Sequence, residues 1–524
     1  MSPPRGIYSR SDWPQVPDVR VRNRRFGGDL YELSCDVVVV GSGAGGAVVA
    51  AELAEGGLDV VVLEEGGYYA TEDFNADVTQ ALGNLYRDGG AQMALGTPPV
   101  TFAEGRCVGG STVINGGMTW RTPEHVIRRW AEDHGVAHCT PDALLPHFER
   151  VEGYLSAGIQ SPESIGRDNT LLKEGAEALG YDTIPNIRNQ LHCVGSNNCA
   201  FGCPTGAKQS TLLTYLPRAL HFGARILTHC RVDNLLRRRK QVTGVEGSLA
   251  DPSGKTRRFR VHARETVISC GAVQTPNLLL RSGLRSPSGR IGHGLTLHPN
   301  TKVVALFDED VEGWKGVHQA YQVREFEDDG FLMAAVNIPP SLVAMTMPYY
   351  GQDMLDLLDQ YKQTVVGGVL IEDTTSGRVR SVGGLPVPTY QITEEDRQRI
   401  VRGTAIVCDV LFAAGAKRIV LPFEGVPDLH SRADVERLRQ THVPKSAMEV
   451  VTVHIMGTAA MGGDPTRHVC DSYGRVYDFA GLSVADASLF PTPIGVNPME
   501  TIMTLATRCA IHLLDRFAVP AGAR

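Results

Sequence analysis

The clearest hydrophobic pattern in the chain lies near its N-terminus, in the sequence DVVVVGSGAGGAVVAAELAEGGLDVVVLE of residues 36–64. The run of valines over 37–40 predicts a strand that is buried on both faces. Small and apolar residues over 44–54 predict a helix, and a second apolar run over 60–63 predicts another buried strand. Residues 36–64 are therefore expected to form a strand–helix–strand unit of an α/β domain.

Glycines at a fixed spacing separate the first strand from the helix. Gly41, Gly43 and Gly46 follow the pattern G-x-G-x-x-G, and Glu64 ends the second strand 18 residues later. The glycines allow a tight turn and close approach of a pyrophosphate, and the helix N-terminus supplies free N–H groups. A carboxylate at the end of the second strand can bind a ribose hydroxyl. The order of these parts predicts a dinucleotide-binding site.

A second glycine-rich segment, GRCVGGSTVINGGM, covers residues 105–118. Five glycines in fourteen residues disfavour a regular helix or strand. Its apolar residues, among them Val108 and Ile114, are unusual for a surface loop. We expect its backbone to lie against a flat or anionic group.

The second half of the chain shows weaker patterns, one with the alternation typical of a strand and one with the spacing typical of a helix. Residues 364–373 (TVVGGVLIED) contain an alternating stretch, and residues 394–416 carry apolar side chains at helical spacing. Both are expected to pack in the core of a second domain.

Composition and charge exclude several classes of function. The chain of 524 residues has 51 basic and 58 acidic residues, a net charge of −7, which gives no electrostatic basis for binding nucleic acid. No apolar run is long enough for a membrane span. The N-terminal residues lack the apolar core of a secretory signal, so we expect a cytoplasmic protein whose eleven cysteines are mostly reduced thiols.

Several segments together resemble one family. The segment GRCVGGSTVINGGM resembles the first signature of the glucose–methanol–choline (GMC) flavoprotein oxidoreductases, and SCGAVQTPNLLLRSGL (269–284) resembles the second. The segment IGHGLTLHP (291–299) resembles the stretch that follows it. HIMGTAAMG (454–462) and LSVADASLFPTPIGVNPMETIM (482–503) resemble the C-terminal catalytic region. The resemblance implies an FAD-dependent enzyme that oxidises alcohols.

The resemblance also implies a fold and domain limits. It predicts an α/β protein in which a Rossmann-like FAD-binding domain is interleaved with an α+β substrate domain built on an antiparallel sheet. The FAD-binding domain would comprise residues 1–120, 226–300 and 451–524, and the substrate domain residues 121–225 and 301–450.

The resemblance places the FAD along matching positions. The pyrophosphate would lie at the first glycine motif, the ribose at Glu64, the adenine beside the backbone of Val232, and the isoalloxazine over the second glycine segment. No histidine occurs between residues 105 and 120, so FAD is expected to bind non-covalently. The residues expected to bind FAD are Gly41, Gly43, Ala44, Gly46, Glu64, Glu65, Arg106, Gly109, Gly110, Asn115, Gly116, Val232, Asp486, Ala487, Pro498 and Met499.

The catalytic residues implied by the resemblance are His454 and Asn497. A neutral imidazole suits the removal of a hydroxyl proton while a hydride leaves for flavin N5. An asparagine amide can both donate to and accept from the substrate oxygen. Without the resemblance, His454 would be taken as a hydrogen-bonded core histidine. His298 and the remaining histidines are expected to be structural.

Three cysteines lie close together in CVGSNNCAFGCPTG, at positions 193, 199 and 203. The loop resembles the three-cysteine loop of GMC sugar dehydrogenases that carry a [3Fe–4S] cluster and pass electrons to a partner protein. This resemblance implies that Cys193, Cys199 and Cys203 would bind such a cluster. A zinc site would need a fourth ligand, a disulfide is disfavoured in the cytoplasm, and three free thiols are the remaining alternative.

A second resemblance bears on the substrate. Residues 201–216 and 336–385 are similar to the long-chain fatty-alcohol oxidases, which pass electrons to oxygen. We therefore expect a small-molecule substrate, a hydrophobic long-chain or cyclic alcohol. A glycoside or sugar dehydrogenase, and an FAD-containing lyase without net redox chemistry, remain the alternatives.

Overall fold

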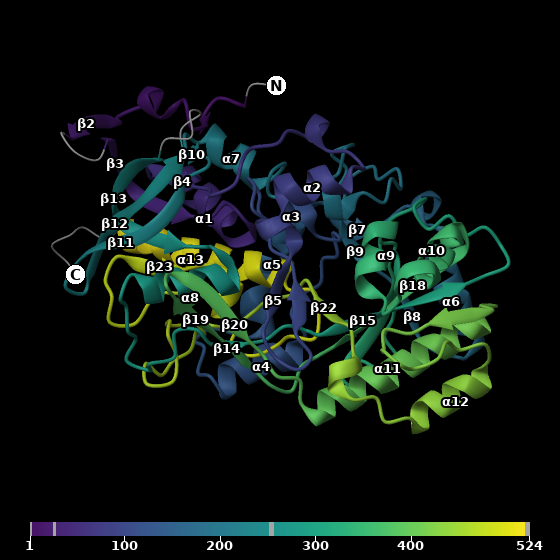
Figure 1. The fold of residues 1–524 in the computed structure, drawn as a ribbon. Coiled ribbons are helices and arrows are strands. Elements are labelled where there is room, and N and C mark those ends of the chain that lie inside the picture. Colours follow the sequence, from purple (N-terminus) through teal and green to yellow (C-terminus); the bar gives the residue numbers. More distant parts are fainter. Residues whose placement is uncertain (1–2, 25–27, 251–255, 519–524) are drawn as a thin grey trace.

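The computed structural model describes residues 3–24, 28–250 and 256–518, and two large β-sheets define its two halves (Figure 1). The first sheet lies on the same side of the molecule as both chain termini, and the second sheet lies on the opposite side (Figure 1). The helices pack against the faces of the two sheets.

The first sheet is mainly parallel and contains the predicted strand–helix–strand unit. Within the described residues its main path has the order β1-β10-β4-β3-β13-β12-β11, with β2 beside β3 and β23 beside β13. The strands are β1 (Ile7–Tyr8), β2 (Arg20–Arg24), β3 (Gly28–Val40), β4 (Val60–Leu63), β10 (Arg225–Leu227), β11 (Arg231–Arg238), β12 (Gln241–Ala250), β13 (Thr256–Ile268) and β23 (Leu482–Val484).

Helices cover both faces of this sheet, as the unbroken valine run predicts. Alternate residues of β3 and β4 enter two different hydrophobic clusters: Val37, Val39, Val60 and Val62 in one, and Val38, Val40, Val61 and Leu63 in the other. The first cluster includes α1 (Ala44–Glu55), α7 (Tyr215–His221) and α13 (Met499–Ala518), and the second includes α4 (Glu124–Glu132), α5 (Pro141–Leu155) and α8 (Gly271–Arg281). The Rossmann-like prediction is confirmed.

The second sheet is antiparallel except where β6 and β22 pair. Its path within the described residues is β5-β6-β22-β15-β18-β17-β16-β8, with β21 beside β15. The strands are β5 (Gln92–Ala94), β6 (Val100–Phe102), β8 (Thr183–Pro185), β15 (Asn300–Leu306), β16 (Tyr321–Val323), β17 (Phe331–Ala335), β18 (Thr364–Ile371), β21 (Arg418–Val420) and β22 (Val450–Thr452). The predicted α+β domain on an antiparallel sheet is confirmed.

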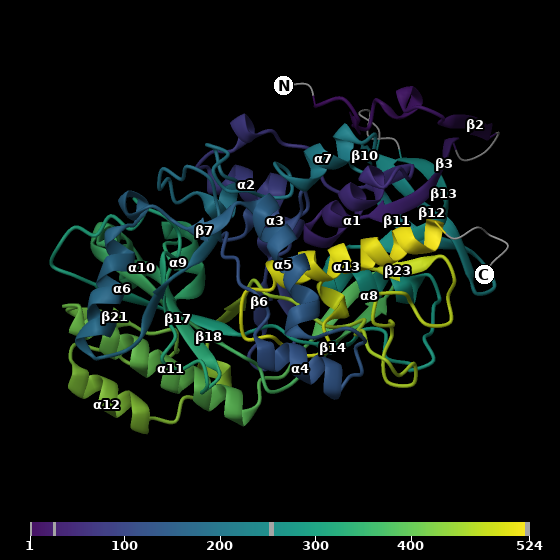
Figure 2. The ribbon, with the colours of Figure 1, turned by 180° about the vertical axis from the view of Figure 1, so that it is seen from behind.

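Both faces of the second sheet carry helices (Figure 2). One face packs against α6 (Arg167–Ala178) and α11 (Glu394–Ala413), with α12 (Arg432–Gln440) beyond. Part of the other face packs against α9 (Pro340–Thr346) and α10 (Gly351–Asp359). The helix predicted over 394–416 is α11, and the strand predicted within 364–373 is β18.

Two short strands enter the second sheet from the range 1–120, which is the range predicted for the FAD-binding domain. Strand β6 lies parallel to β22 in the register Thr101↔Val451, and β5 pairs with β6. The second sheet therefore includes segments from the range predicted for the FAD-binding domain. The exact domain limits stay predictions.

The remaining elements are short or connect the two halves. Strands β14 (His293–Leu295), β19 (Gly377–Val382) and β20 (Leu385–Thr389) form a small sheet, and β7 (Ala157–Ile159) pairs with β9 (Ile187–Asn189). Helices α2 (Val78–Leu85) and α3 (Ser111–Ile114) lie between the two large sheets (Figure 1). None of the described helices is long and apolar enough to cross a membrane.

Candidate active site

A cavity of about 480 Å³ runs between the two sheets and is lined from both of them. Its walls include the β3–α1 turn, the glycine segment around α3, the start of β11, the N-terminal part of α8, one face of the second sheet, and the loops before α13. Of the predicted FAD-binding and catalytic residues, all but Gly46 and Gly109 line this cavity.

Gly46 and Gly109 do not line the cavity, but they allow the segments that form its walls to pack closely. A Cβ at Gly46 would lie 2.0 Å from the carbonyl oxygen of Gly41, so the absence of a side chain lets α1 close against its own turn. A Cβ at Gly109 would meet Val113 and Leu212. Both glycines therefore allow close packing.

The two predicted glycine segments meet across the cavity. A Cβ at Gly110 would lie 2.8 Å from the Cα of Gly43, so the two backbones approach one another as closely as their lack of side chains allows. Gly43 is the N-cap of helix α1 and has no side chain to cap it, so the first N–H groups of the helix have no partner from a capping residue. This free helix N-terminus, lined by glycines, fits the pyrophosphate of a dinucleotide.

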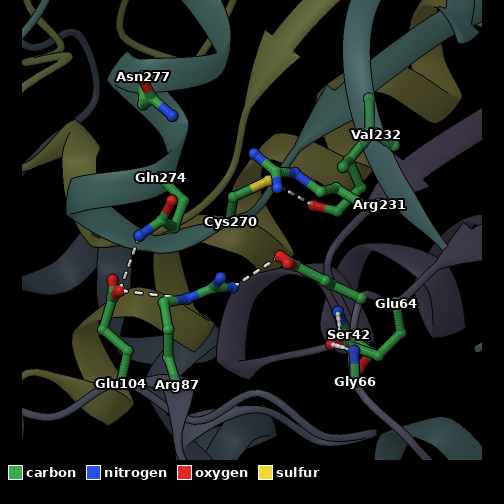
Figure 3. Close-up of polar contacts among 12 residues, drawn as sticks. Ser42, Glu64, Gly66, Arg87, Glu104, Arg231, Val232, Cys270, Gln274 and Asn277 are labelled. Atoms are coloured by element: carbon green, nitrogen blue, oxygen red, sulfur yellow. Dashed lines mark hydrogen bonds and ion pairs between the residues drawn. The ribbon is translucent and has the colours of Figure 1, made fainter. Parts of the chain in front are cut away.

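Glu64 lies at the cavity wall, with its carboxylate bound to the chain (Figure 3). Its Oε2 accepts from the backbone N–H of Ser42 at 3.0 Å and from the Ser42 hydroxyl at 2.6 Å, and its Oε1 accepts from Gly66 N–H at 2.9 Å. Burial raises the pKa of Glu64, although these hydrogen bonds oppose that shift. Glu64 thus holds the glycine turn in place; its contact with a ribose stays a prediction.

An ionic network that sequence patterns did not indicate lines the same wall (Figure 3). Arg87 donates to Glu65 at 2.9 Å and lies 3.5 Å from Glu104, which accepts from the amide of Gln274 at 3.0 Å. Burial raises the pKa of Glu104, against the effect of the Arg87 charge. Arg87 and Glu104 lie outside every motif, so no local signal identified them.

Asp486 ties the C-terminal segment to α8 at the cavity wall. Its carboxylate accepts from Thr275 Oγ1 at 2.5 Å, from Gly271 N–H at 2.9 Å and from Ser488 N–H at 2.8 Å. Burial raises its pKa. The predicted cofactor residues Asp486 and Ala487 are thereby fixed beside the first glycine turn.

The predicted catalytic pair is brought together at the cavity wall. His454, which is 6% exposed, has its Nε2 3.0 Å from Nδ2 of Asn497. On its other side, Nδ1 of His454 lies 3.2 Å from Nδ1 of His298. His298 was expected to be structural, but it touches the predicted base directly. Its place in the segment IGHGLTLHP, which resembles a family segment, is a signal that could have identified it.

His298 sets the proton positions in this row of side chains. Its Nε2 accepts the backbone N–H groups of Ile494 at 3.3 Å and Gly495 at 3.1 Å. The proton of neutral His298 is therefore on Nδ1 and is donated to Nδ1 of His454. Neutral His454 then carries its own proton on Nε2, and Asn497 can accept that proton by turning its amide oxygen toward the ring.

Burial keeps His454 neutral. Burial, the larger cause, and the positive charge of Lys302 together lower the pKa of His454 to about 4. An unprotonated imidazole at neutral pH is the form in which a histidine can accept a proton.

The cysteine loop is not assembled as a metal site. Among the described residues, no group of three or more His, Cys, Asp or Glu side chains is placed to hold a metal ion, and Cys193, Cys199 and Cys203 are free thiols. Instead the loop is fastened to the glycine segment: Arg188 donates to the sulfur of Cys199 at 3.6 Å and to the carbonyl of Gly116 at 2.5 Å.

Models of known protein families match most of the chain. Models of the GMC oxidoreductase family match residues 82–300 and 373–506, and a model described as an FAD binding domain matches residues 36–79. A GMC-type oxidoreductase of Mycobacterium tuberculosis is 39% identical over 91% of this chain and 75% of its own length. The chain belongs to the GMC oxidoreductase family. FAD is its cofactor.

A long-chain-alcohol oxidase and a solved oxidase structure are also similar to this GMC oxidoreductase. A long-chain-alcohol oxidase of Arabidopsis thaliana is 28% identical over 91% of this chain and 66% of its own length. The crystal structure of pyridoxine 4-oxidase from Mesorbium loti has a TM-score of 0.69 at 20% identity and covers 91% of this chain and 99% of its own, which shows a shared fold.

Proposed function

We propose that this GMC oxidoreductase oxidises the CH–OH group of an alcohol to an aldehyde or ketone, with His454 as base and Asn497 as the residue that orients the substrate oxygen. The observation that carries the proposal is the 3.0 Å contact between these two side chains at the wall of the cavity that also contains both glycine segments. A proton acceptor and an orienting amide converge on one point beside the FAD site.

The residues present fit a non-covalently held FAD. The uncapped N-terminus of α1 would hold the pyrophosphate, and the backbone around Gly110 and Asn115 would lie along the ring system. The chemistry that bound FAD supplies is acceptance of a hydride from the carbinol carbon.

Residues of the chain accept the hydroxyl proton of the substrate and orient its oxygen. To accept the substrate's hydroxyl proton at Nε2, His454 has to carry its own proton on Nδ1, and it then gives up the hydrogen bond from the Nδ1–H of His298. His454 then takes up the hydroxyl proton at Nε2 as the hydride leaves. The Asn497 amide holds the substrate oxygen so that the carbinol carbon faces the FAD site.

The apolar lining of the cavity and the similarity to a long-chain-alcohol oxidase both indicate the substrate class. Apolar side chains, namely Leu332, Ala334, Val336, Leu370 and Val453, line the part of the cavity formed by the second sheet and the segment after β22. The similarity to a long-chain-alcohol oxidase supports a hydrophobic alcohol as substrate and oxygen as the electron acceptor.

Anaerobic mixing of the purified holoenzyme with 1-dodecanol tests the proposal. Bleaching of the oxidised flavin spectrum, followed by reoxidation and hydrogen peroxide formation in air, is expected. Flavin that stays oxidised while product accumulates would instead identify a lyase. Turnover of glucosides with no activity on aliphatic alcohols would favour the sugar dehydrogenase.

Assays of iron and acid-labile sulfide on the same sample test the cysteine loop separately. Nothing in the described residues supports a cluster, so the proposal does not include one. About three irons per chain would restore the [3Fe–4S] prediction and an electron-accepting partner protein.

The rate of flavin reduction should depend on pH through His454. Because burial lowers its pKa to about 4, the imidazole is neutral at higher pH and becomes protonated only as the pH falls through that value. With 1-dodecanol the limiting reduction rate should be flat from neutral pH down to about pH 5 and fall by half near pH 4. Stopped-flow pH jumps measure this. A half-point near the ordinary histidine pKa would contradict the assignment.

His298→Ala should slow flavin reduction by roughly 10- to 100-fold, because His454 loses the contact that holds its ring and a small misplacement of a base has effects of that size. FAD content should be unchanged, since His298 does not line the FAD cavity. His293→Ala, a change in the preceding strand β14, is the matched control. Equal rates in the two variants would remove His298 from the mechanism.

A further inference from the structure

One face of β15 presents a row of polar side chains to the cavity. His298 comes just before the strand and touches His454, and Asn300 and Lys302 follow at every second residue. Because side chains of a strand alternate between its faces, Asn300 and Lys302 lie on the same face, and both line the cavity. Asn300 and Lys302 therefore form a polar row on the cavity face of the second sheet, and the loop before this row carries His298.

The ammonium group of Lys302 lies across the neighbouring strand. Lys302 pairs with Gly368 of β18, and a Cβ at Gly368 would lie 2.8 Å from Nζ of Lys302. Gly368 thus provides the space that the amine occupies.

Lys302 has no partner of opposite charge in the part of the chain that the structure describes, where neither a hydrogen bond nor an ion pair involves its Nζ. Lys208, the comparable buried lysine, donates from Nζ to the carbonyl oxygens of Val113 at 2.7 Å, Asn115 at 2.8 Å and Cys199 at 2.5 Å. Burial lowers the pKa of both lysines to about 8. Of the two, Lys302 has its amine available to a molecule in the cavity.

Asn300 is a second group without a partner. It is 6% exposed, lines the cavity, and its Oδ1 makes no hydrogen bond with the described residues. An unpaired polar atom in such a place costs free energy unless a ligand satisfies it. Asn300 and Lys302 together are therefore prepared for a polar group of the substrate.

We propose that the alcohol substrate also carries a carboxylate and that Lys302 binds it. This inference rests on the proposed alcohol oxidation and narrows its substrate class. An anion fits because a buried ammonium is stabilised by a charge-assisted hydrogen bond, and because a bound carboxylate would offset the charge that lowers the basicity of His454.

The position of Lys302 along β15 indicates how long the substrate acid is. Within β15, a rise of about 3.3 Å per residue places the Cα of Lys302 roughly 7 Å beyond that of Asn300 and farther from His298, which lies before the strand. The residues beside Asn300 and Lys302 on the adjacent strands β18 and β17 are apolar or small: Leu370, Gly368, Leu332 and Ala334. A chain of several methylene groups, with a hydroxyl at the base and a carboxylate at Lys302, fits this arrangement. The substrate class is a hydroxy fatty acid.

Matched substrates and one substitution test this. The holoenzyme is assayed with a series of ω-hydroxy fatty acids and with the unsubstituted primary alcohols of the same lengths. Wild type should prefer the hydroxy acids by about tenfold or more in kcat/KM, as expected for one well-placed ionic contact. Lys302→Met should remove that preference by raising KM for the acids far more than KM for the unsubstituted alcohols.

Binding without turnover gives a second measurement. Dodecanoate, which has no hydroxyl to oxidise, should raise the Tm of wild-type holoenzyme and not that of Lys302→Met. Lys315→Met is the control, because Lys315 lies on the surface and pairs with Glu312. FAD content of each variant confirms that it folds.

The outcomes separate this inference from the proposed function. Reduction of FAD by unsubstituted alcohols with no preference for hydroxy acids at any length would overturn the carboxylate site and leave alcohol oxidation intact. An equal loss of kcat/KM on both substrate series in Lys302→Met would also overturn it, since Lys302 would then act on the reaction itself. Absence of FAD reduction by every substrate would refute the proposed function.

Discussion

His454→Ala should retain bound FAD and lose its reduction by alcohol, with a fall in the anaerobic reduction rate of about 10²- to 10⁴-fold, the range typical for removal of a general base. The imidazole is the one group in the Asn497–His454–His298 row that can take the hydroxyl proton at the cavity wall. The amide of Asn497 has no basic lone pair on nitrogen.

The measurement is stopped-flow reduction of the flavin at saturating 1-dodecanol. His125→Ala, at an exposed position of α4, is the control and should match wild type. Flavin reduced at the wild-type rate in the His454 variant would exclude His454 as the base. A variant that loses FAD would instead show that His454 holds the cavity together.

Gly45→Ala should prevent stable assembly of the FAD site. A Cβ at Gly45 would lie 1.6 Å from the carbonyl oxygen of Ala485, an overlap with backbone that no rotamer relieves. Helix α1 would have to move away from the segment that carries Asp486, which lines the cavity beside it. We expect a loss of at least about 3 kcal/mol in the free energy of unfolding, the upper part of the range for overpacking.

The Tm and the FAD content per chain measure this effect, and both should fall together. Gly83→Ala is the matched control, since a Cβ there meets nothing within 4 Å and the residue lies inside α2. Alanine at that position should stabilise the helix slightly. A Gly45 variant with unchanged Tm and full FAD content would show that α1 can shift without harm.

The sequence by itself determined the elements whose patterns are local. The valine runs of residues 37–40 and 60–63 and the small residues between them specify two buried strands and a helix, because burial on both faces requires an unbroken apolar run. The apolar period of α11 specified that helix in the same way. The glycine motif at Gly41–Gly46 and the segments resembling the GMC family indicated the cofactor and the cavity residues.

Only the tertiary structure decided which distant residues meet. His454 and Asn497 are 43 positions apart and His454 and His298 are 156 apart, so no local period relates them. The contact of Gly45 with Ala485 likewise depends on how α1 packs, although Gly45 is an unspecified position of its motif.

The same holds for the polar row on the second sheet. Lys302 and Asn300 stand in a strand whose other residues are ordinary core residues, and nothing in the sequence indicates that their face is open to a cavity. Pairing with Gly368, 66 positions away by residue number, and the approach of the glycine segments create that opening. Strand register and packing arise from the whole chain, because the free energy of each contact depends on burial that many distant segments provide together.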